Sequence, residues 1–247
     1  MTIFVEDISQ FPGPGMDYPS GFTFSPDGRY LAYLKIDSSN MERSLYLTES
    51  RNFNEKLLVG ATGEITREES LEEELRKQRL RQMSGGISQY FWTSDNKIVF
   101  KMHGDIFVLD NLDSTPRLLV DASEFSSMDP KVSPNGKNLA FVCRGEIYTV
   151  RLEGGTPVKL TDGKAGTTRG LAEYIAQEEM GRSSGYWWSP DSKSIAFIEV
   201  DETNIPEFML TNLGDELVPN ETYRYPFAGC DNADVRLGIT DLHGNVS

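Results

Sequence analysis

A short pattern of hydrophobic and polar residues occurs four times along the chain. Each copy has an aromatic or apolar residue, a hydroxyl-containing turn with Asp or Asn, and then a run of mostly apolar residues. The copies begin at Phe24, Trp92, Val132 and Trp188. Where Pro is present it fixes φ at the first corner of the turn, and Asp or Asn followed by Gly tolerates a left-handed second corner. The pattern therefore predicts four tight turns, each leading into a β-strand.

Two further apolar segments follow each of the first three copies. We expect second strands at residues 45–47, 105–109 and 146–150, and third strands at 56–59, 117–120 and 158–160. Short strands repeated at this spacing are typical of β-propeller blades. We predict an all-β fold: a β-propeller of four-stranded antiparallel blades with short helical insertions. Three full blades and the start of a fourth are visible, so the propeller is incomplete.

The spacing between equivalent turn residues locates the insertions. Ser25, Thr93, Ser133 and Ser189 are 68, 40 and 56 residues apart, and a bare blade needs about 40. The first long interval contains a charged segment at about 66–82 with acids toward its front and bases toward its back, as a helix dipole favours. The second contains a segment at about 171–180 with apolar residues at helical spacing, and Gly181 can end that helix. We therefore predict two helices.

The second predicted helix ends in two adjacent carboxylates, Glu178 and Glu179. Neighbouring residues lie about 100° apart around a helix, so the two charges repel unless a cation lies between them. A protonated peptide amino terminus is such a cation. The alternative interpretation is a solvated acidic helix end.

Two segments resemble one known family. The run from Ala176 to Met180 (Ala-Gln-Glu-Glu-Met), followed by Gly185 to Asp191 (Gly-Tyr-Trp-Trp-Ser-Pro-Asp), resembles the glutamate-pair helix of the dipeptidyl peptidase IV family. A second run, Arg224 to Gly229 with Asn232 just after it, resembles a segment that follows this helix in the same family. One departure is Gly181, where the family pattern has an acidic residue.

The resemblance has implications for fold, activity and site residues. The family contains serine exopeptidases of the prolyl oligopeptidase group, in which an N-terminal β-propeller precedes an α/β-hydrolase domain. The resemblance implies that Glu178 and Glu179 hold the free amino terminus of a peptide, so that dipeptides are removed. In the cytosolic branch of the family, an arginine near the end of a charged helix hydrogen-bonds the peptide. There the helix precedes a Gly-Ile-x-x-Tyr strand, which Gly86 to Tyr90 resembles here, so the resemblance assigns that role to Arg81, with Arg79 second. The alternative for Arg81 is a solvated base paired within its helix.

The composition of the chain excludes some classes of binding partner. With 24 basic and 38 acidic residues the formal charge is −14, which disfavours nucleic acid and anionic membrane surfaces. No apolar run reaches the length of a membrane span, and the first residues lack the pattern of a signal peptide, so we expect a cytoplasmic protein. His103 and His243 are isolated, and we expect neither a metal site nor a cofactor.

The sequence also bears on catalysis. Gly181 to Gly185 matches the Gly-x-Ser-x-Gly pattern of hydrolase nucleophiles, but a helix precedes it and a strand follows, the reverse of a nucleophile elbow. We therefore do not assign Ser183 as a nucleophile, and we name no catalytic residue. We expect residues 1–247 to be part of an N-terminal propeller domain without the hydrolase domain, as a fragment, a truncated isoform or a partial gene product.

Two functional hypotheses follow. The first is the substrate-recognition propeller of a serine dipeptidyl peptidase that acts on peptides with a free amino terminus and proline or alanine as second residue. This chain alone would be inactive, and the resemblance allows for a homodimer of the full-length form. The second is a non-catalytic propeller, either a protein-interaction module or a pseudo-enzyme.

Overall fold

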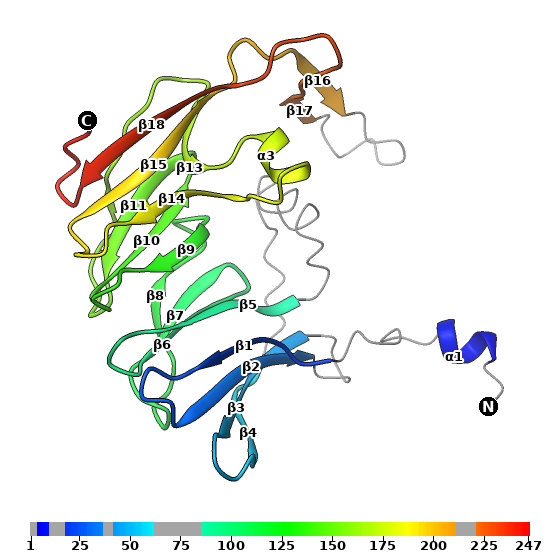
Figure 1. Ribbon diagram of the computed structural model, residues 1–247, viewed down its shortest axis with the longest axis vertical. Helices are drawn as coiled ribbons and strands as arrows, with labels where there is room; N and C mark the ends of the chain where they lie inside the picture. The colour runs from blue at the N-terminus through cyan, green and yellow to red at the C-terminus, as the bar shows by residue number, and fades with distance from the viewer. Residues whose placement is uncertain (1–3, 10–17, 37–41, 62–84, 211–220) are drawn as a thin grey trace. The chain divides into compact units, whose positions relative to one another are not determined.

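The computed structural model describes residues 4–9, 18–36, 42–61, 85–210 and 221–247 (Figure 1). These residues form two compact units. The first comprises the chain up to Ser127 with residues 135–137 and 152–155, and the second comprises residues 128–134, 138–151 and 156–247. The helix predicted at about 66–82 lies outside the described residues.

The first unit contains two four-stranded antiparallel blades and a short helix, α1 (Val5–Ser9). The first blade consists of β1 (Ser20–Phe24), β2 (Tyr30–Ile36), β3 (Glu42–Glu49) and β4 (Glu55–Val59). The second consists of β5 (Gly85–Trp92), β6 (Ile98–Met102), β7 (Asp105–Leu109) and β8 (Arg117–Val120). A short parallel pairing of β3 with β5 joins the blades, and their facing apolar residues form one core.

The second unit contains the next two blades. The third blade consists of β9 (Met128–Val132), β10 (Asn138–Cys143), β11 (Glu146–Arg151) and β12 (Val158–Lys159). The fourth consists of β13 (Thr167–Leu171), β14 (Ser184–Trp188), β15 (Ser194–Asp201) and β18 (Asp234–Asp241). A hairpin of β16 (Glu207–Leu210) and β17 (Glu221–Arg224) extends from the fourth blade. Tyr186 and Phe197 are buried between the third and fourth blades.

The four predicted turns share one hydrogen-bonding scheme. In three of them a hydroxyl donates to the Asp two residues later, at 2.6 Å from Ser25 to Asp27, 2.6 Å from Thr93 to Asp95 and 2.7 Å from Ser189 to Asp191. The left-handed corner is at Gly28, Asn96, Gly136 or Ser192. In each turn the hydroxyl also accepts a backbone N–H at the start of the next strand, from its first residue in three turns and from Lys97, just before β6, in the other. The repeat is therefore confirmed as four equivalent turns.

The predicted fold class is confirmed. Every blade is antiparallel, the strands predicted after the first three turns are present, and the strands described here do not close a ring of blades. The β-propeller is therefore incomplete. No helix in the part of the chain that the structure describes has the length and apolar character needed to span a membrane.

The predicted boundaries of the second helix are wrong. The helix, α3, spans only Tyr174–Glu178. Leu171 is a strand residue paired with Ser184, because its apolar side chain packs into the core between the third and fourth blades. Glu173 is the N-cap, with its carboxylate accepting the N–H of Ala176 at 3.1 Å. Gly181 has the predicted left-handed φ of 63°, but the C-cap of α3 is Glu179, so Gly181 lies two residues beyond the cap and reverses the chain after the helix has ended.

Candidate functional site

The helix with the carboxylate pair interrupts a strand. β13 and β14 pair with successive stretches of the same edge of β15. Thr167 to Arg169 lie opposite Asp201 to Glu199, and Tyr186 to Trp188 lie opposite Phe197 to Ile195. Residues 170–185 lie between these two stretches and do not pair with β15, so they form a protrusion between two segments of one strand position. We call these residues the excursion.

Two glycines form the base of the excursion. Gly170 and Gly185 are paired between β13 and β14. A Cβ atom on Gly185 would lie 2.6 Å from backbone atoms of Leu171, and one on Gly170 would lie 2.8 Å from Cγ2 of Val142. Gly170 also has a φ of 88°, which disfavours other residues. The close approach of the two chain segments thus requires residues without side chains.

Within the excursion, α3 is held on the sheet by small apolar residues. Ala176 is fully buried and belongs to a cluster with Ala172 of the excursion and Ile198 and Val200 of β15. The Gln177 side chain donates to the carbonyl of Ala172 at 2.6 Å. These contacts fix one face of the helix against the fourth blade.

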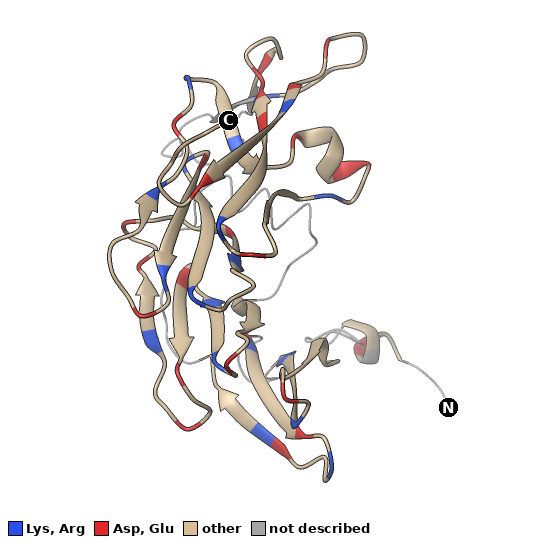
Figure 2. Ribbon diagram, turned by 60° about the vertical axis from the view of Figure 1, so that its left-hand side comes forward, with Lys and Arg blue, Asp and Glu red and all other residues tan. Residues whose placement is uncertain are grey.

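Glu178 and Glu179 are both exposed at the end of this helix. They follow the buried Ala176 by two and three residues. Glu178 therefore lies about 160° from Ala176 around the helix axis, on the opposite side, whereas Glu179 lies only about 60° away but is the C-cap, where the helix has already ended. Figure 2 shows acidic residues on α3. Both carboxylates are accessible to a ligand, as the amine-binding hypothesis requires, and a solvated helix end would share this exposure.

The segment from Arg224 to Gly229, which also resembles the family, contacts α3. The ring of Tyr225 packs edge-on against that of Tyr174, the first residue of α3, with centroids 5.1 Å apart. Further edge contacts join Tyr225 to Phe227 at 5.0 Å and Phe227 to Phe208 of β16 at 5.7 Å. In Figure 1, α3 lies beside the β16–β17 hairpin. The fold thus brings together two segments that are separate in the sequence, a contact that the sequence analysis did not predict.

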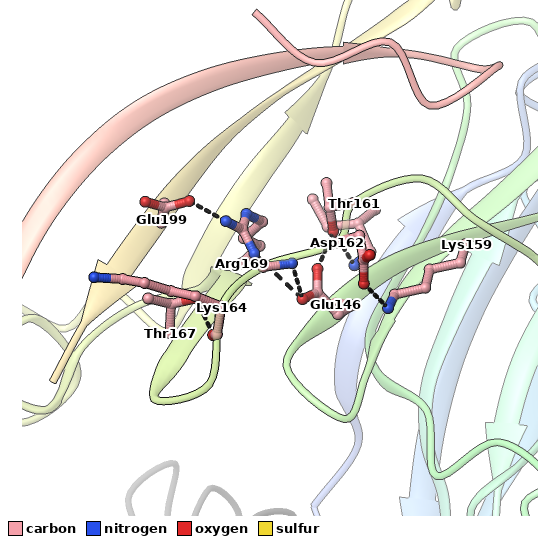
Figure 3. Close-up of polar contacts among 10 residues, drawn as sticks. Glu146, Lys159, Thr161, Asp162, Lys164, Thr167, Arg169 and Glu199 are labelled. Carbon is pink, nitrogen blue, oxygen red and sulfur yellow. Dashed lines mark hydrogen bonds and ion pairs between the residues drawn. The ribbon is translucent and has the colours of Figure 1, made fainter. Parts of the chain in front are cut away.

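A buried ion cluster holds the strand that enters the excursion (Figure 3). The Arg169 guanidinium is 3.2 Å from Oε1 of Glu146 and also pairs with Glu199. The Arg169 and Glu146 side chains are each only 11% exposed. Glu146 further accepts hydrogen bonds from the Thr161 hydroxyl at 2.6 Å and the Gly163 N–H at 2.7 Å. The residue immediately before Gly170 is therefore fixed to both the third and the fourth blade.

A second cation holds the strand that returns. Lys131 of β9 donates to the carbonyl of Tyr186 at 2.6 Å and to the hydroxyl of Ser184. Its ammonium lies 4.0 Å from the centre of the Tyr186 ring and 3.2 Å from a carboxylate oxygen of Asp129. The Trp188 indole donates to the Lys131 carbonyl at 3.1 Å. Both ends of the excursion are thus tied to charged groups of the third blade.

One carboxyl at the far end of β15 has a perturbed pKa. Asp201 is 2.6 Å from the Lys164 ammonium and accepts the Thr203 hydroxyl at 2.6 Å. The hydrogen bond from Lys164, and after it the one from Thr203, hold the pKa of Asp201 well below its usual range. This carboxyl is therefore ionised at neutral pH.

The remaining sequence predictions concern Arg81 and Arg79, Ser183, and metal binding. Arg81 and Arg79 lie outside the described residues. Ser183 follows a helix and immediately precedes β14, an order opposite to that of a nucleophile elbow. Among the described residues, no three His, Cys, Asp or Glu side chains come together as a metal site requires.

Comparison with known proteins identifies the family. The family described as "Dipeptidyl peptidase IV (DPP IV) N-terminal region" matches residues 87–247. This chain belongs to that family. The match includes the third and fourth blades, the excursion and the hairpin.

Individual relatives are similar over part of the chain. A protein of Schizosaccharomyces pombe named as a dipeptidyl aminopeptidase is 37% identical over 126 residues, which are 47% of this chain and 16% of that protein. Human prolyl endopeptidase FAP is 34% identical over 113 residues, 44% of this chain and 15% of that protein. Rat inactive dipeptidyl peptidase 10 is 30% identical over 113 residues, 44% of this chain and 14% of that protein.

A solved structure supports the fold over the whole chain. The crystal structure of Porphyromonas gingivalis dipeptidyl peptidase 4 has a TM-score of 0.64 and 22% sequence identity, and the match covers 100% of this chain and 35% of that one. The dipeptidyl peptidase IV-like chain thus spans about a third of that protein, and it matches 14–16% of the length of the relatives above.

Proposed function

We propose that this chain is the substrate-recognition propeller portion of a cytoplasmic serine dipeptidyl peptidase, and that Glu178 and Glu179 bind the free amino terminus of the peptide. A hydrolase domain in a longer protein would supply the nucleophile, and a dipeptide with proline or alanine as second residue would be released. The observation that supports this proposal is the exposed carboxylate pair on a helix anchored at both ends of a strand interruption.

The chemistry of the pair suits an ammonium group. Two adjacent carboxylates offer several acceptor positions, and their mutual repulsion is relieved when a cation lies between them. Hydrogen bonds between charged partners are short and stronger than neutral ones. Because the amino terminus is a fixed distance from each peptide bond, holding it selects the bond that is cleaved.

A binding experiment tests the proposal directly. The 247-residue chain is titrated with the peptide Ala-Pro-Ala and with its N-acetylated form, and binding is followed by calorimetry or NMR. We expect the free peptide to bind and the acetylated one not to bind. Glu178→Gln and Glu179→Gln should each weaken binding, whereas Glu153→Gln, a change at an exposed glutamate in the loop between β11 and β12, should not. Equal binding of both peptides to the unaltered chain would contradict the proposal.

The same proposal holds that this chain alone does not hydrolyse dipeptidyl substrates. The assay is release of a chromogenic amine from a Gly-Pro derivative. Turnover that disappears in Ser183→Ala would show that Ser183 is a nucleophile after all.

One observation favours the alternative of a non-catalytic propeller. A relative that is 30% identical over 113 residues is named as inactive. In that case the chain would serve as a protein-interaction module or as part of a pseudo-enzyme. Sequencing the transcript beyond Ser247 separates the two functions, because only the enzyme requires a Gly-x-Ser-x-Gly motif placed after a strand.

A further inference from the structure

We propose that Arg182 is a positioning residue for the carboxylate pair. Its contacts hold α3 so that Glu178 and Glu179 stand where the peptide's amino terminus arrives. This proposal rests on the proposed function and extends it to a residue outside the helix.

The helix needs such support because it is short. α3 has five residues, far fewer than the roughly 12 to 15 that an isolated helix needs to be even marginally stable in water. Each end of a helix also leaves backbone groups without partners inside it. The placement of Glu178 and Glu179 is therefore determined by contacts from outside the helix.

Arg182 makes contacts before, within and after this helix. Its backbone N–H donates to the carbonyl of Ala176 at 2.9 Å. Its Nη2 lies 3.4 Å from Oε2 of Glu173, whose other oxygen caps the helix through the N–H of Ala176. Its Nη1 donates to the carbonyl of Ser184 at 3.2 Å. One side chain thus links the N-cap of α3 to the first residue of the returning strand.

The chain reversal at Gly181 makes these contacts possible. Gly181 has a left-handed φ of 63°, and the position its Cβ would occupy is open. The reversal turns Arg182 back toward the start of the helix. The planar guanidinium presents several N–H groups in a fixed fork, so it can reach Glu173 and Ser184 together, whereas a lysine ammonium acts as a single point charge.

A purely structural role and a positioning role for Arg182 predict different experimental outcomes. The Arg182 and Glu173 side chains are 37% and 13% exposed, and an ion pair near the surface contributes little to global stability. A merely structural surface pair would therefore leave binding unchanged. A positioning residue would change binding and the local protection of α3, with little change in the melting temperature.

The experiment compares Arg182→Gln and Arg182→Lys with a control, Arg151→Gln, at an exposed arginine of β11. Hydrogen exchange of the Ala176 amide reports on the N-cap, and titration with Ala-Pro-Ala reports on the carboxylate pair. We expect Arg182→Gln to speed exchange at Ala176 and to weaken binding about two- to thirtyfold, the range for loss of a helix cap. Arg182→Lys should show a smaller effect, and Arg151→Gln none.

Glu173→Gln provides a second route to the same answer, because it keeps a capping oxygen and removes the ionic partner of Arg182. It should weaken binding, and combining it with Arg182→Gln should weaken binding no further. If the unaltered chain binds the peptide and both single variants bind it equally well, Arg182 is not a positioning residue. If the unaltered chain does not bind, the proposed function fails. Faster exchange at Ala176 in Arg182→Gln would then still show that Arg182 holds α3.

Discussion

Gly170 and Gly185 face each other as the pair that closes the base of the excursion. The strand on which they lie continues on either side, with Arg169 opposite Glu199 and Tyr186 opposite Phe197. Only Ile198 of β15 lies between these two pairs. The carboxylate pair is thus positioned by two strand segments that act as one strand of the fourth blade.

We expect Gly185→Ala to destabilise the second unit. Its new Cβ would lie 2.6 Å from backbone atoms of Leu171, and a backbone neighbour cannot rotate away as a side chain can. Such overpacking costs about 1–3 kcal/mol. The measurement is the free energy of unfolding from denaturant titration.

Gly85→Ala is the matched control for this change. A Cβ on Gly85 would lie 3.5 Å from the flexible side chain of Glu42, an ordinary contact. Its free energy of unfolding should be close to that of the unaltered chain. An equal loss in both variants would show that the close approach of Leu171 and Gly185 is unimportant.

A second prediction concerns Arg169. Arg169→Gln leaves Glu146 and Glu199 without their shared cation in a site where the Arg169 and Glu146 side chains are 11% exposed. Removing one partner of a buried ion pair costs about 3–5 kcal/mol, because the remaining charge stays in a poorly solvated place. The measurement is again denaturant unfolding.

Lys159→Gln tests whether burial is the cause. Lys159 pairs with Asp162 close to the same cluster, but their side chains are 40% and 86% exposed. An exposed pair contributes little to stability, so this variant should unfold almost as the unaltered chain does. Similar losses in the two variants would contradict the importance of burial at Arg169.

The sequence predicts the local parts of this fold well. Each turn is determined by a few adjacent residues, as in the hydrogen bond from Ser25 to Asp27, so the repeat could be read directly. The interruption of a strand by the excursion could not be predicted from the sequence, because the pairing of Arg169 with Glu199 depends on a segment 30 residues away. Leu171 fits both helical and strand spacing, and its packing in the core decides for the strand.

In the candidate site, too, the features set by adjacent residues were predictable and those set by distant residues were not. Glu178, Glu179 and the left-handed Gly181 follow from the local sequence. The contact of Tyr174 with Tyr225 does not, because it joins the helix to the residue that follows β17, about 50 residues later. Nothing in the spacing of these aromatic residues indicates that their rings meet. Sequence reasoning thus found the charged groups but not the residues that hold them in place.

The pKa of Asp201 leads to a prediction of pH dependence. Because its pKa is lower in the folded chain than in the unfolded one, its contribution to stability is complete above the ordinary Asp pKa of about 3.9. This contribution is lost as the pH falls through the folded pKa. Asp201→Asn should therefore lower stability at neutral pH, and the difference from the unaltered chain should shrink in strong acid.

Lys164→Gln should reproduce most of this effect, since Lys164 is the main cause of the lowered pKa. Thermal unfolding of the three proteins between neutral pH and pH 2 provides the comparison. A constant difference between Asp201→Asn and the unaltered chain across that range would show that Asp201 does not titrate as expected.

The last prediction concerns Glu178 and Glu179 in the longer enzyme that we propose. Each charge-assisted hydrogen bond contributes on the order of 1.5–3 kcal/mol, so Glu178→Gln or Glu179→Gln should lower kcat/KM roughly ten- to a hundredfold. Because the contact fixes which bond lies at the reacting centre, kcat should fall together with binding. The measurement is cleavage kinetics with a free-amine dipeptidyl substrate.

Two controls accompany these kinetics. An amino-blocked peptide should be a poor substrate for the unaltered enzyme and for both variants, because it lacks the charge that the pair binds. The melting temperature should hardly change, since both carboxylates are exposed and removing one relieves their repulsion. A loss of activity with unchanged stability therefore places the effect in the site and not in the fold. Undiminished cleavage by both variants would instead mean that the pair is a solvated helix end.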